Sequence, residues 1–538
     1  MTAVAQLSRF LTEVISETNG LSLDDTLRLA SQSTAPPDVA RLITEFRELL
    51  GRFRLDQERL EALLDHPFST ALADVFRAFP IPYREEHIHL TGSLDAGFVW
   101  PHLERLLNGP NRDVIERKIA EVYGPESLPI RNVADVDRLI RLDEKGRFAQ
   151  YLRVLYLPKL ILTSREIHRD AAYHMASTLY RQHNVGSLRL KFTLFRSTTE
   201  SAEQIPGLDA LTAEDVVLGL HEGFAQFRRE CPTFQFILSP SFRKEPSFYD
   251  AGAFPSKRAH FDDQVRQIIE LLAKHPHLRE SMSEVDTVGD ERGFYRKVHF
   301  QEMRVGFRKL QAYGFRTRSH HGETWNTLRQ GIQAVDNAMN IWHVDAIEHG
   351  LSLGINPNYY FHSMLQRLLR VNAERLPVDP RSSEHAELLE MEWNGREEIR
   401  EKLLRGELLD EREITLFTKA KFHLATEVEH YQHDVLNRMI DKRLTLVSLP
   451  SSNQRLTGAL ADYKDHPFSW WEKKGLRLGV GTDNYVTLST NFIREMLILL
   501  YTDPTELKIT KLLIVTTGES RRPYISHLLW EMRKRFRA

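Results

Sequence analysis

Short apolar segments alternate with longer amphipathic segments from Tyr83 almost to the end of the chain. The short segments are four to eight residues long and rich in Val, Ile, Leu and Phe, which is typical of buried strands. The longer segments carry apolar residues three and four positions apart, as helices do, in Asp215–Arg229, Asp263–Ala273 and Phe300–Tyr313. Eight strands that alternate with helices predict an α/β fold, the (β/α)8 TIM barrel. The predicted strands are His87–Leu90, Leu188–Phe195, Phe234–Leu238, Met282–Asp286, Phe315–Ser319, Val344–Glu348, Leu444–Leu449 and Leu476–Val480.

Two regions do not follow this alternation. Residues 1–82 show helical periodicity, for example in Arg41–Phe53 and Glu58–Leu64, and we expect an N-terminal helical region there. Nearly one hundred residues separate the sixth predicted strand from the seventh, and they are charged and helical in pattern. We therefore expect residues 83–538 to form the barrel, with a helical insertion at 358–432 that serves as a lid or an assembly surface. The insertion and the N-terminal region are the candidate surfaces for a homo-oligomer.

Composition excludes several classes of protein. The 538 residues carry a formal charge of −2, so no basic surface for nucleic acid is predicted. The single cysteine, Cys231, excludes a disulfide framework and zinc sites built from cysteine pairs, including those of the His/Cys/Cys base deaminases. The N-terminus lacks the pattern of a signal peptide, and no apolar run approaches the ~20 residues of a membrane span. We expect a soluble cytoplasmic protein with no membrane partner.

Histidines and acids follow several of the predicted strands. His87 and His89 alternate on the first strand, so both imidazoles point to one side, although such pairs also occur by chance. His320 and Glu323 end the fifth strand, where Glu323 could instead simply favour the first turn of a helix. His349 ends the sixth strand. Active sites of barrels lie at the carboxyl ends of the strands, which favours a functional role for the group.

Asp483 and Asn484 follow the eighth predicted strand, and Asp483 taken alone is better explained as a helix cap. Taken together, the pattern predicts one mononuclear metal site with a position left open for water. Three imidazoles and one carboxylate suit zinc, although iron or cobalt are also accepted by such ligands. Zinc lowers the pKa of a bound water toward about 7, and Glu323 and His349 are then the candidate proton handlers. The predicted ligands are His87, His89, His320 and Asp483.

Seven stretches of the sequence resemble the adenosine deaminase family of metal-dependent amidohydrolases. They occur in the family's order between Tyr83 and Asn484, whereas residues 1–82 and the insertion lie outside the resemblance. The stretches are HIHLTGSL (His87–Leu94), VDTVGDE (Val285–Glu291), SHHGET (Ser319–Thr324), IEHGL (Ile347–Leu351), LPSSNQRLTG (Leu449–Gly458), HPF (His466–Phe468) and GVGTDN (Gly479–Asn484).

The resemblance implies a zinc-dependent hydrolytic deamination at C6 of adenine, with one zinc ion per chain on the four ligands named above. It implies that Glu323 protonates the purine N1 and that His349 orients or deprotonates the metal-bound water. It further implies that the backbone of Gly289 contacts N3 and that Asn484 faces N7. The expected partner is therefore a small purine nucleoside or nucleotide.

Two departures from the family pattern bear on the substrate. Thr91 stands where members that act on free adenosine carry an aspartate for the sugar 5′-hydroxyl, and a neutral side chain tolerates a 5′-phosphate there. We therefore expect AMP or dAMP in preference to the nucleoside. Asn484 replaces a second aspartate, and its amide donates directly to N7, which is an acceptor. Arg243, Lys244 and Arg196 are candidate phosphate ligands, with surface ion pairs as the alternative.

Two other functions stay open from the sequence. One is hydrolysis of another amide or amidine by the same barrel and metal. The other is a catalytically idle scaffold whose insertion mediates assembly. Purine metabolism and bacterial anti-phage defence are both compatible physiological roles.

Overall fold

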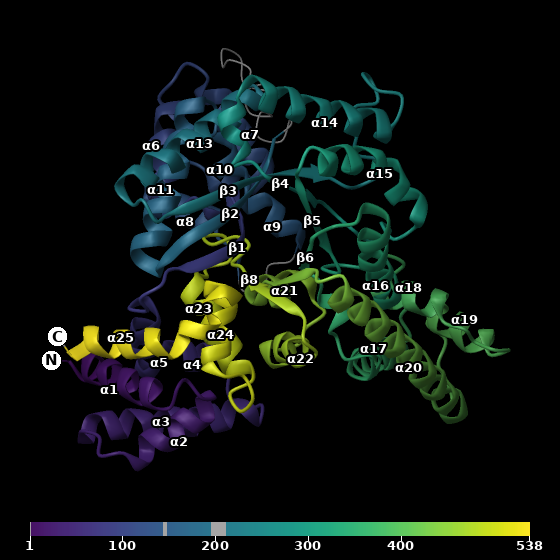
Figure 1. Cartoon of the computed structure of the whole chain (residues 1–538). Coiled ribbons are helices and arrows are strands. Elements are labelled where there is room, and N and C mark those ends of the chain that lie inside the picture. The colour runs from purple at the N-terminus through teal and green to yellow at the C-terminus, as the bar shows by residue number, and fades with distance from the viewer. Residues whose placement is uncertain (1, 144–147, 195–210, 538) are drawn as a thin grey trace.

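The computed structural model describes residues 2–143, 148–194 and 211–537, and within them eight parallel strands pair in chain order (Figure 1). The ring closes between the first strand and the residues after the eighth. The amide of His89 donates to the carbonyl of Asp483 at 2.7 Å, and the amide of Asp483 donates to the carbonyl of His87 at 3.0 Å. The predicted (β/α)8 barrel is confirmed. Its strands are β1 (Tyr83–His89), β2 (Val185–Thr193), β3 (Gln235–Arg243), β4 (Glu284–Val288), β5 (Arg316–His321), β6 (Ala346–His349), β7 (Thr445–Ser448) and β8 (Arg477–Val480).

The strand ends differ from the predicted ones because part of the barrel interior is polar. β3 continues past the predicted apolar segment to Arg243, and Ser239 and Ser241 on this extension are buried. β1 begins at Tyr83 and includes buried Glu85, which an apolar pattern does not mark as strand. The predicted end of the second strand, Phe195, lies outside the described residues, as does Arg196.

Helices cover the outside of the barrel. The helix after β2 starts with a capping box, in which Thr212 and Asp215 exchange hydrogen bonds with each other's backbone amides. The helices after β2, β3, β4 and β5 are α13 (Ala213–Glu230), α14 (Lys257–Lys274), α15 (Lys297–Ala312) and α16 (Leu328–Asn337). α16 is followed by a π-helical turn, η4 (Ala338–Trp342). α21 (Pro450–Thr457) and α22 (Phe468–Lys473) follow β7.

Two connections between strands are long, whereas the sequence marked only the one after β6. The β6–β7 connection contains α17 (Pro357–Ala373), α18 (Ser383–Glu390), α19 (Glu397–Arg405) and the long α20 (Glu411–Asp441). The sequence analysis did not mark the β1–β2 connection as a second long one. It contains α6 (Ala96–Leu107), α7 (Arg112–Tyr123), α8 (Val133–Ile140), α9 (Phe148–Val154), α10 (Tyr156–Leu160) and α11 (Arg165–His183).

The N-terminal helices pack against the C-terminal ones, and both ends of the chain lie side by side (Figure 1). Arg533 pairs with Glu17 at 2.7 Å, and Tyr501 shares a hydrogen bond of 2.5 Å with Ser69. The helices are α1 (Ala3–Glu17), α2 (Leu23–Gln32), α3 (Pro37–Arg54), α4 (Leu60–Asp65) and α5 (Pro67–Arg77), then α23 (Phe492–Thr502), α24 (Ile509–Thr517) and α25 (Ile525–Arg537). Buried side chains of these helices and of the barrel form one continuous hydrophobic core.

Candidate metal centre and active site

Three histidine side chains converge at the carboxyl ends of β1 and β5. The Nε2 atoms of His87 and His89 lie 3.1 Å apart, and those of His89 and His320 lie 3.3 Å apart. Asp483 joins them, with its Oδ1 at 3.6 Å from Nε2 of His87 and 3.3 Å from Nε2 of His89. The structure thus brings together all four of the predicted ligands. Residues of the first, fifth and eighth strand ends meet because the barrel closes between β1 and β8.

The protonation pattern of the cluster favours a cation at its centre. Nδ1 of His87 lies 2.8 Å from Oε2 of Glu348, and Nδ1 of His320 lies 2.9 Å from Oδ2 of Asp286. A carboxylate accepts only, so each of these imidazoles carries its proton on Nδ1 and turns the lone pair of Nε2 inward. Lone pairs and a carboxylate that face one another need a positive charge between them. The donor set of three imidazoles and one carboxylate fits zinc.

Asp483 is held in a strained conformation. Its φ is +62°, in the left-handed region, as is that of His349 at +68°. The Ser452 hydroxyl donates to its Oδ2 at 2.5 Å, and the Asn484 amide donates to its Oδ1 at 2.7 Å. Both donors stabilise the charged form of the Asp483 carboxyl. Asp483 therefore stays a carboxylate.

A buried lysine connects the two carboxylates behind the histidines. Nζ of Lys191, on β2, lies 2.8 Å from Oε1 of Glu348 and 3.2 Å from Oδ2 of Asp286, and its side chain is fully buried. One cation thus contacts both groups that orient His87 and His320. The sequence analysis assigned no role to Lys191, Glu348 or Asp286, although Asp286 and Glu348 lie within two of the stretches that carry the family resemblance.

Glu323 and His349, the predicted proton handlers, lie beside this cluster. Oε2 of Glu323 lies 3.8 Å from Nε2 of His349, whose Nδ1 contacts Oδ1 of Asn453 at 2.9 Å. The turn that carries Glu323 is fixed by Glu291. This buried carboxylate accepts the backbone amides of Gly322 at 3.0 Å and Thr324 at 2.6 Å, as well as that of Glu323 itself. The Glu323 carboxyl can therefore approach a bound molecule without rearrangement of its backbone.

The residues that the sequence predicts to contact the substrate lie at different places around the cluster. Thr91 begins the 3-10 turn directly after β1 and is half-buried. Asn484 is fully buried behind it, packed against Gly92 so closely that a Cβ there would lie 1.7 Å from Oδ1 of Asn484. Gly289 has a φ of +111° and lies against the carboxylate of Glu245. Arg243 donates to that same carboxylate, at 3.1 Å and 2.5 Å, so its charge is already paired.

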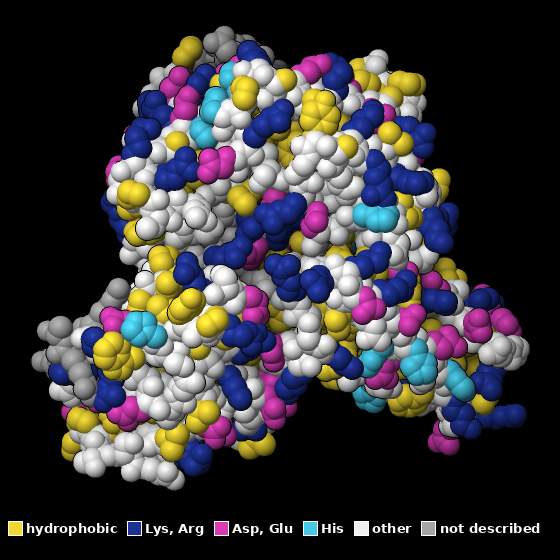
Figure 2. All heavy atoms as spheres, in the orientation of Figure 1, with side chains coloured by type: hydrophobic (Ala, Val, Ile, Leu, Met, Phe, Trp, Pro, Cys, Tyr) yellow, Lys and Arg dark blue, Asp and Glu magenta, His cyan; other side chains and the backbone are white. Residues whose placement is uncertain are grey.

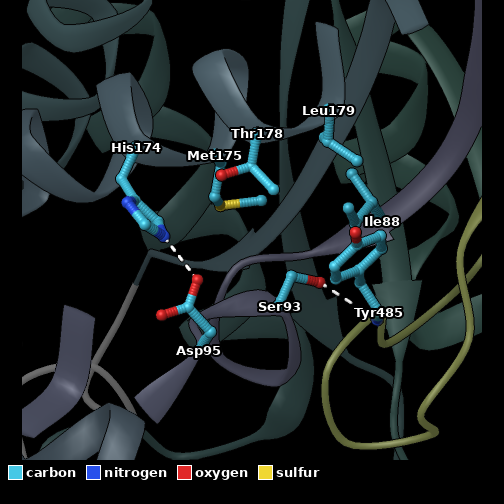
Figure 3. Close-up of a pocket in the computed structure, with 8 residues that line it drawn as sticks. All are labelled: Ile88, Ser93, Asp95, His174, Met175, Thr178, Leu179 and Tyr485. Carbon is cyan, nitrogen blue, oxygen red and sulfur yellow. Dashed lines mark hydrogen bonds and ion pairs between the residues drawn. The ribbon is translucent and has the colours of Figure 1, made fainter. Parts of the chain in front are cut away.

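A small cavity lies beside β1 and α11, away from the histidine cluster (Figure 3). His174 points into it and pairs with Asp95 at 2.6 Å, and the Ser93 hydroxyl accepts from the amide of Tyr485 at 3.3 Å. These groups satisfy one another and tie the turn after β1 to α11. The contacts that line this cavity therefore stabilise the loop that contains Thr91.

Solved structures share this fold. An amidohydrolase with bound Zn from Burkholderia ambifaria matches with a TM-score of 0.50 and 14% identity, over 86% of this chain and 94% of that one. An adenine deaminase from Arthrobacter aurescens matches with a TM-score of 0.48 and 14% identity, over 84% and 99%. An N6-methyl-AMP deaminase from Arabidopsis thaliana matches with a TM-score of 0.45 and 13% identity, over 86% and 98%. No protein-family profile and no curated protein matches the sequence.

Across residues 2–143, 148–194 and 211–537, every helix is too short or too polar to cross a membrane.

Proposed function

We propose that this protein is a zinc-dependent hydrolase that deaminates the adenine base of a nucleoside or, preferentially, of its 5′-monophosphate. The observation that carries the proposal is the convergence of His87, His89, His320 and Asp483 on one point, with Glu323 and His349 beside it. A metal-bound water on these ligands would supply hydroxide at neutral pH. The Zn-bound amidohydrolase of the same fold supports the choice of metal.

The side chains divide the proton transfers between them. Attack on C6 turns a planar carbon tetrahedral, and N1 must gain a proton as this happens. A protonated Glu323 carboxyl can donate that proton and thereby become a carboxylate. His349 keeps its Nδ1 directed at Asn453, so its Nε2 faces Glu323 and the cluster and can accept a proton from the attacking water. The proton on His349 then passes to the amino nitrogen and the new C6 hydroxyl returns a proton to Glu323, so that ammonia leaves and the base becomes hypoxanthine.

The preference for a monophosphate rests on Thr91. A neutral residue at the start of the turn after β1 avoids the repulsion that an aspartate would exert on a phosphate. Lys and Arg side chains also gather near the centre of the face in Figure 2, in the region where Figure 1 labels α9 and β5. A basic surround favours an anionic substrate.

The test is an ammonia-release screen on zinc-loaded enzyme with adenosine, deoxyadenosine, AMP, dAMP, ADP and ATP. We expect release from AMP or dAMP, less from the nucleosides, and loss of release after chelation. Ammonia from non-purine amides or amidines alone would identify another amidohydrolase activity. Zinc binding without release from any of these compounds would favour the idle scaffold.

A further inference from the structure

The turn that carries Glu323 joins the end of β5 to the start of α16 and is held from two sides. Glu291, which follows β4, accepts the backbone amides of residues 322–324. The second half of the turn runs from Trp325 to Leu328, the first residue of α16, and lies against α18 of the helical insertion. Figure 1 shows α16 and α18 next to each other. The insertion therefore contacts the segment that contains the candidate proton donor.

The central contact is made by Glu387 of α18, whose side chain is buried. Its Oε1 accepts the backbone amide of Leu328 at 2.8 Å and the hydroxyl of Tyr360, on α17, at 3.0 Å. The first amides of a helix have no acceptor within the helix, so the carboxyl group satisfies a donor that α16 leaves unsatisfied. Burial raises the pKa of Glu387 to about 8, so at neutral pH the group is mostly an uncharged acceptor. The side-chain amide of a glutamine can take the place of such a group.

Two longer contacts flank Glu387 on the same face of α18. The Ser383 hydroxyl donates to the carbonyl of Trp325 at 3.5 Å, and the side-chain amide of Gln330 donates to Oε2 of Glu390 at 3.4 Å. Ser383 lies four residues before Glu387 and Glu390 three residues after it, spacings that place all three on one side of a helix. One face of α18 thus meets the chain on both sides of the start of α16.

The rest of the insertion fixes α18 itself. Arg367 of α17 pairs with Glu384 at 2.6 Å, and the indole of Trp393 donates to the carbonyl of Leu388 at 2.9 Å. The ring of Trp393 also stacks on that of Phe417 of α20, and both rings are buried. The position of α18 against the Glu323 turn therefore depends on the fold of the insertion as a whole.

We propose that the helical insertion holds the turn that carries Glu323 from outside the barrel, with Glu387 as the positioning residue. Glu291 fixes the amides at the start of the turn, and Glu387 fixes Leu328, five residues after Glu323. A proton donor that is displaced slightly from its substrate slows the reaction while binding persists, so the contact acts on kcat. This inference rests on the proposed function, because it assumes that Glu323 transfers the proton.

The experiment compares Glu387→Leu, which removes the acceptor, with Glu387→Gln, which keeps it. On zinc-loaded enzyme we expect Glu387→Leu to lower kcat for AMP, or for whichever substrate the screen identifies, by about 10- to 100-fold. The KM of this variant should stay within about threefold of wild type, and Glu387→Gln should keep kcat within about threefold. Hydrogen exchange measured by mass spectrometry is the readout independent of activity. The segment 322–330 should exchange faster in Glu387→Leu than in the wild type or in Glu387→Gln.

Tyr360→Phe removes only a hydroxyl that donates to Glu387 and serves as the test if Glu387→Leu does not fold. It should lower kcat by about 3- to 10-fold, the range of one hydrogen bond, and increase exchange in the same segment. Tyr431→Phe is the matched control. Its hydroxyl donates to Asp336 at 3.1 Å and joins α20 to the other end of α16. This variant should keep the wild-type kcat and the wild-type exchange of the segment 322–330.

Wild-type kcat in Glu387→Leu overturns the inference, whether or not the segment exchanges faster, because Glu323 would then be positioned without the insertion. A loss of kcat in Tyr431→Phe as large as that in Tyr360→Phe overturns it as well. In both cases the wild type still deaminates adenine compounds, so only the role of the insertion fails. If the zinc-loaded wild type releases ammonia from none of them, the proposed function fails, and the inference fails with it.

Discussion

At the scale of single residues, the proposed deamination requires side chains that are each stabilised in a single protonation state by their neighbours. Asp483 remains a carboxylate because Ser452 and Asn484 donate to its oxygens, and Glu348 and Asp286 fix the tautomers of His87 and His320. Glu323 differs, because the hydrogen bonds of Glu291 fix the backbone of its turn and do not involve its carboxyl group. In the proposed reaction, most of these side chains hold their neighbours in place and Glu323 transfers the proton.

Glu323→Gln should bind zinc with wild-type stoichiometry yet lower kcat by about 10²- to 10⁴-fold, because an amide cannot deliver the proton that N1 must gain. The measurement is ammonia release with elemental analysis of the same sample. Turnover near the wild-type level would assign Glu323 to the stabilisation of its helix turn instead.

Thr91→Asp tests the choice between monophosphate and nucleoside. Two like charges ~4 Å apart at an effective dielectric near 20 repel by about 4 kcal/mol, and exposure and salt reduce this. We expect kcat/KM for AMP to fall about 10- to 100-fold more than kcat/KM for adenosine. Thr91→Asn, which adds similar bulk without charge, is the control. Equal losses on both substrates would indicate that the phosphate does not approach this residue.

At the scale of elements, the strands contribute charged side chains to the barrel interior as well as apolar ones. Arg189 and Lys191 on β2 are both buried, and they serve different partners. Arg189 pairs with Glu86 at 2.8 Å and with Glu284 at 2.9 Å, whereas Lys191 contacts the two carboxylates behind the metal-site histidines. Two buried cations that lie two residues apart on one strand thus have different roles. Arg189 stabilises the barrel, and Lys191 supports the carboxylates behind the histidines.

Lys191→Met should lower zinc affinity by about 10- to 100-fold, the range typical of groups that orient metal ligands. Removal of Lys191 takes away the cation that Asp286 and Glu348 share and leaves Glu348 paired with Arg318 alone, so both carboxylates orient His87 and His320 less firmly. Competition with a chromophoric chelator measures the dissociation constant.

Arg189→Met is the matched control, because it removes a cation buried at the same depth without touching those carboxylates. It should destabilise the fold and leave zinc affinity within about threefold of wild type. Equal losses of zinc affinity in both variants would mean that Lys191 acts only through general stability.

At the scale of the whole molecule, three of the proposed metal ligands lie where the barrel closes. The two backbone hydrogen bonds between β1 and the residues after β8 involve His87, His89 and Asp483 themselves. The first and last parts of the chain also pack together through α1, α5, α23 and α25. A metal on these ligands would therefore join the same two parts of the chain that the terminal helices join.

Zinc removal should accordingly lower the melting temperature, by about 2 °C when zinc exceeds its dissociation constant 100-fold. Differential scanning fluorimetry with chelator and then with added zinc measures the shift. A His89→Ala variant, with one ligand deleted, should respond far less to zinc. A melting temperature that is the same with and without the metal would contradict a site at the closure of the barrel.

The sequence by itself determined the order of strands and helices and the residues at the strand ends. Both follow from short-range periodicity, because alternation by two places His87 and His89 on one side whatever the rest of the chain does. It could not predict which carboxylate holds which histidine. The contact of His87 with Glu348 spans 261 positions, and that of Tyr151 with Asn484 spans 333. Only the closed barrel and the packing of the β1–β2 connection over its mouth decided these pairs, because residues this distant meet only when the whole fold forms.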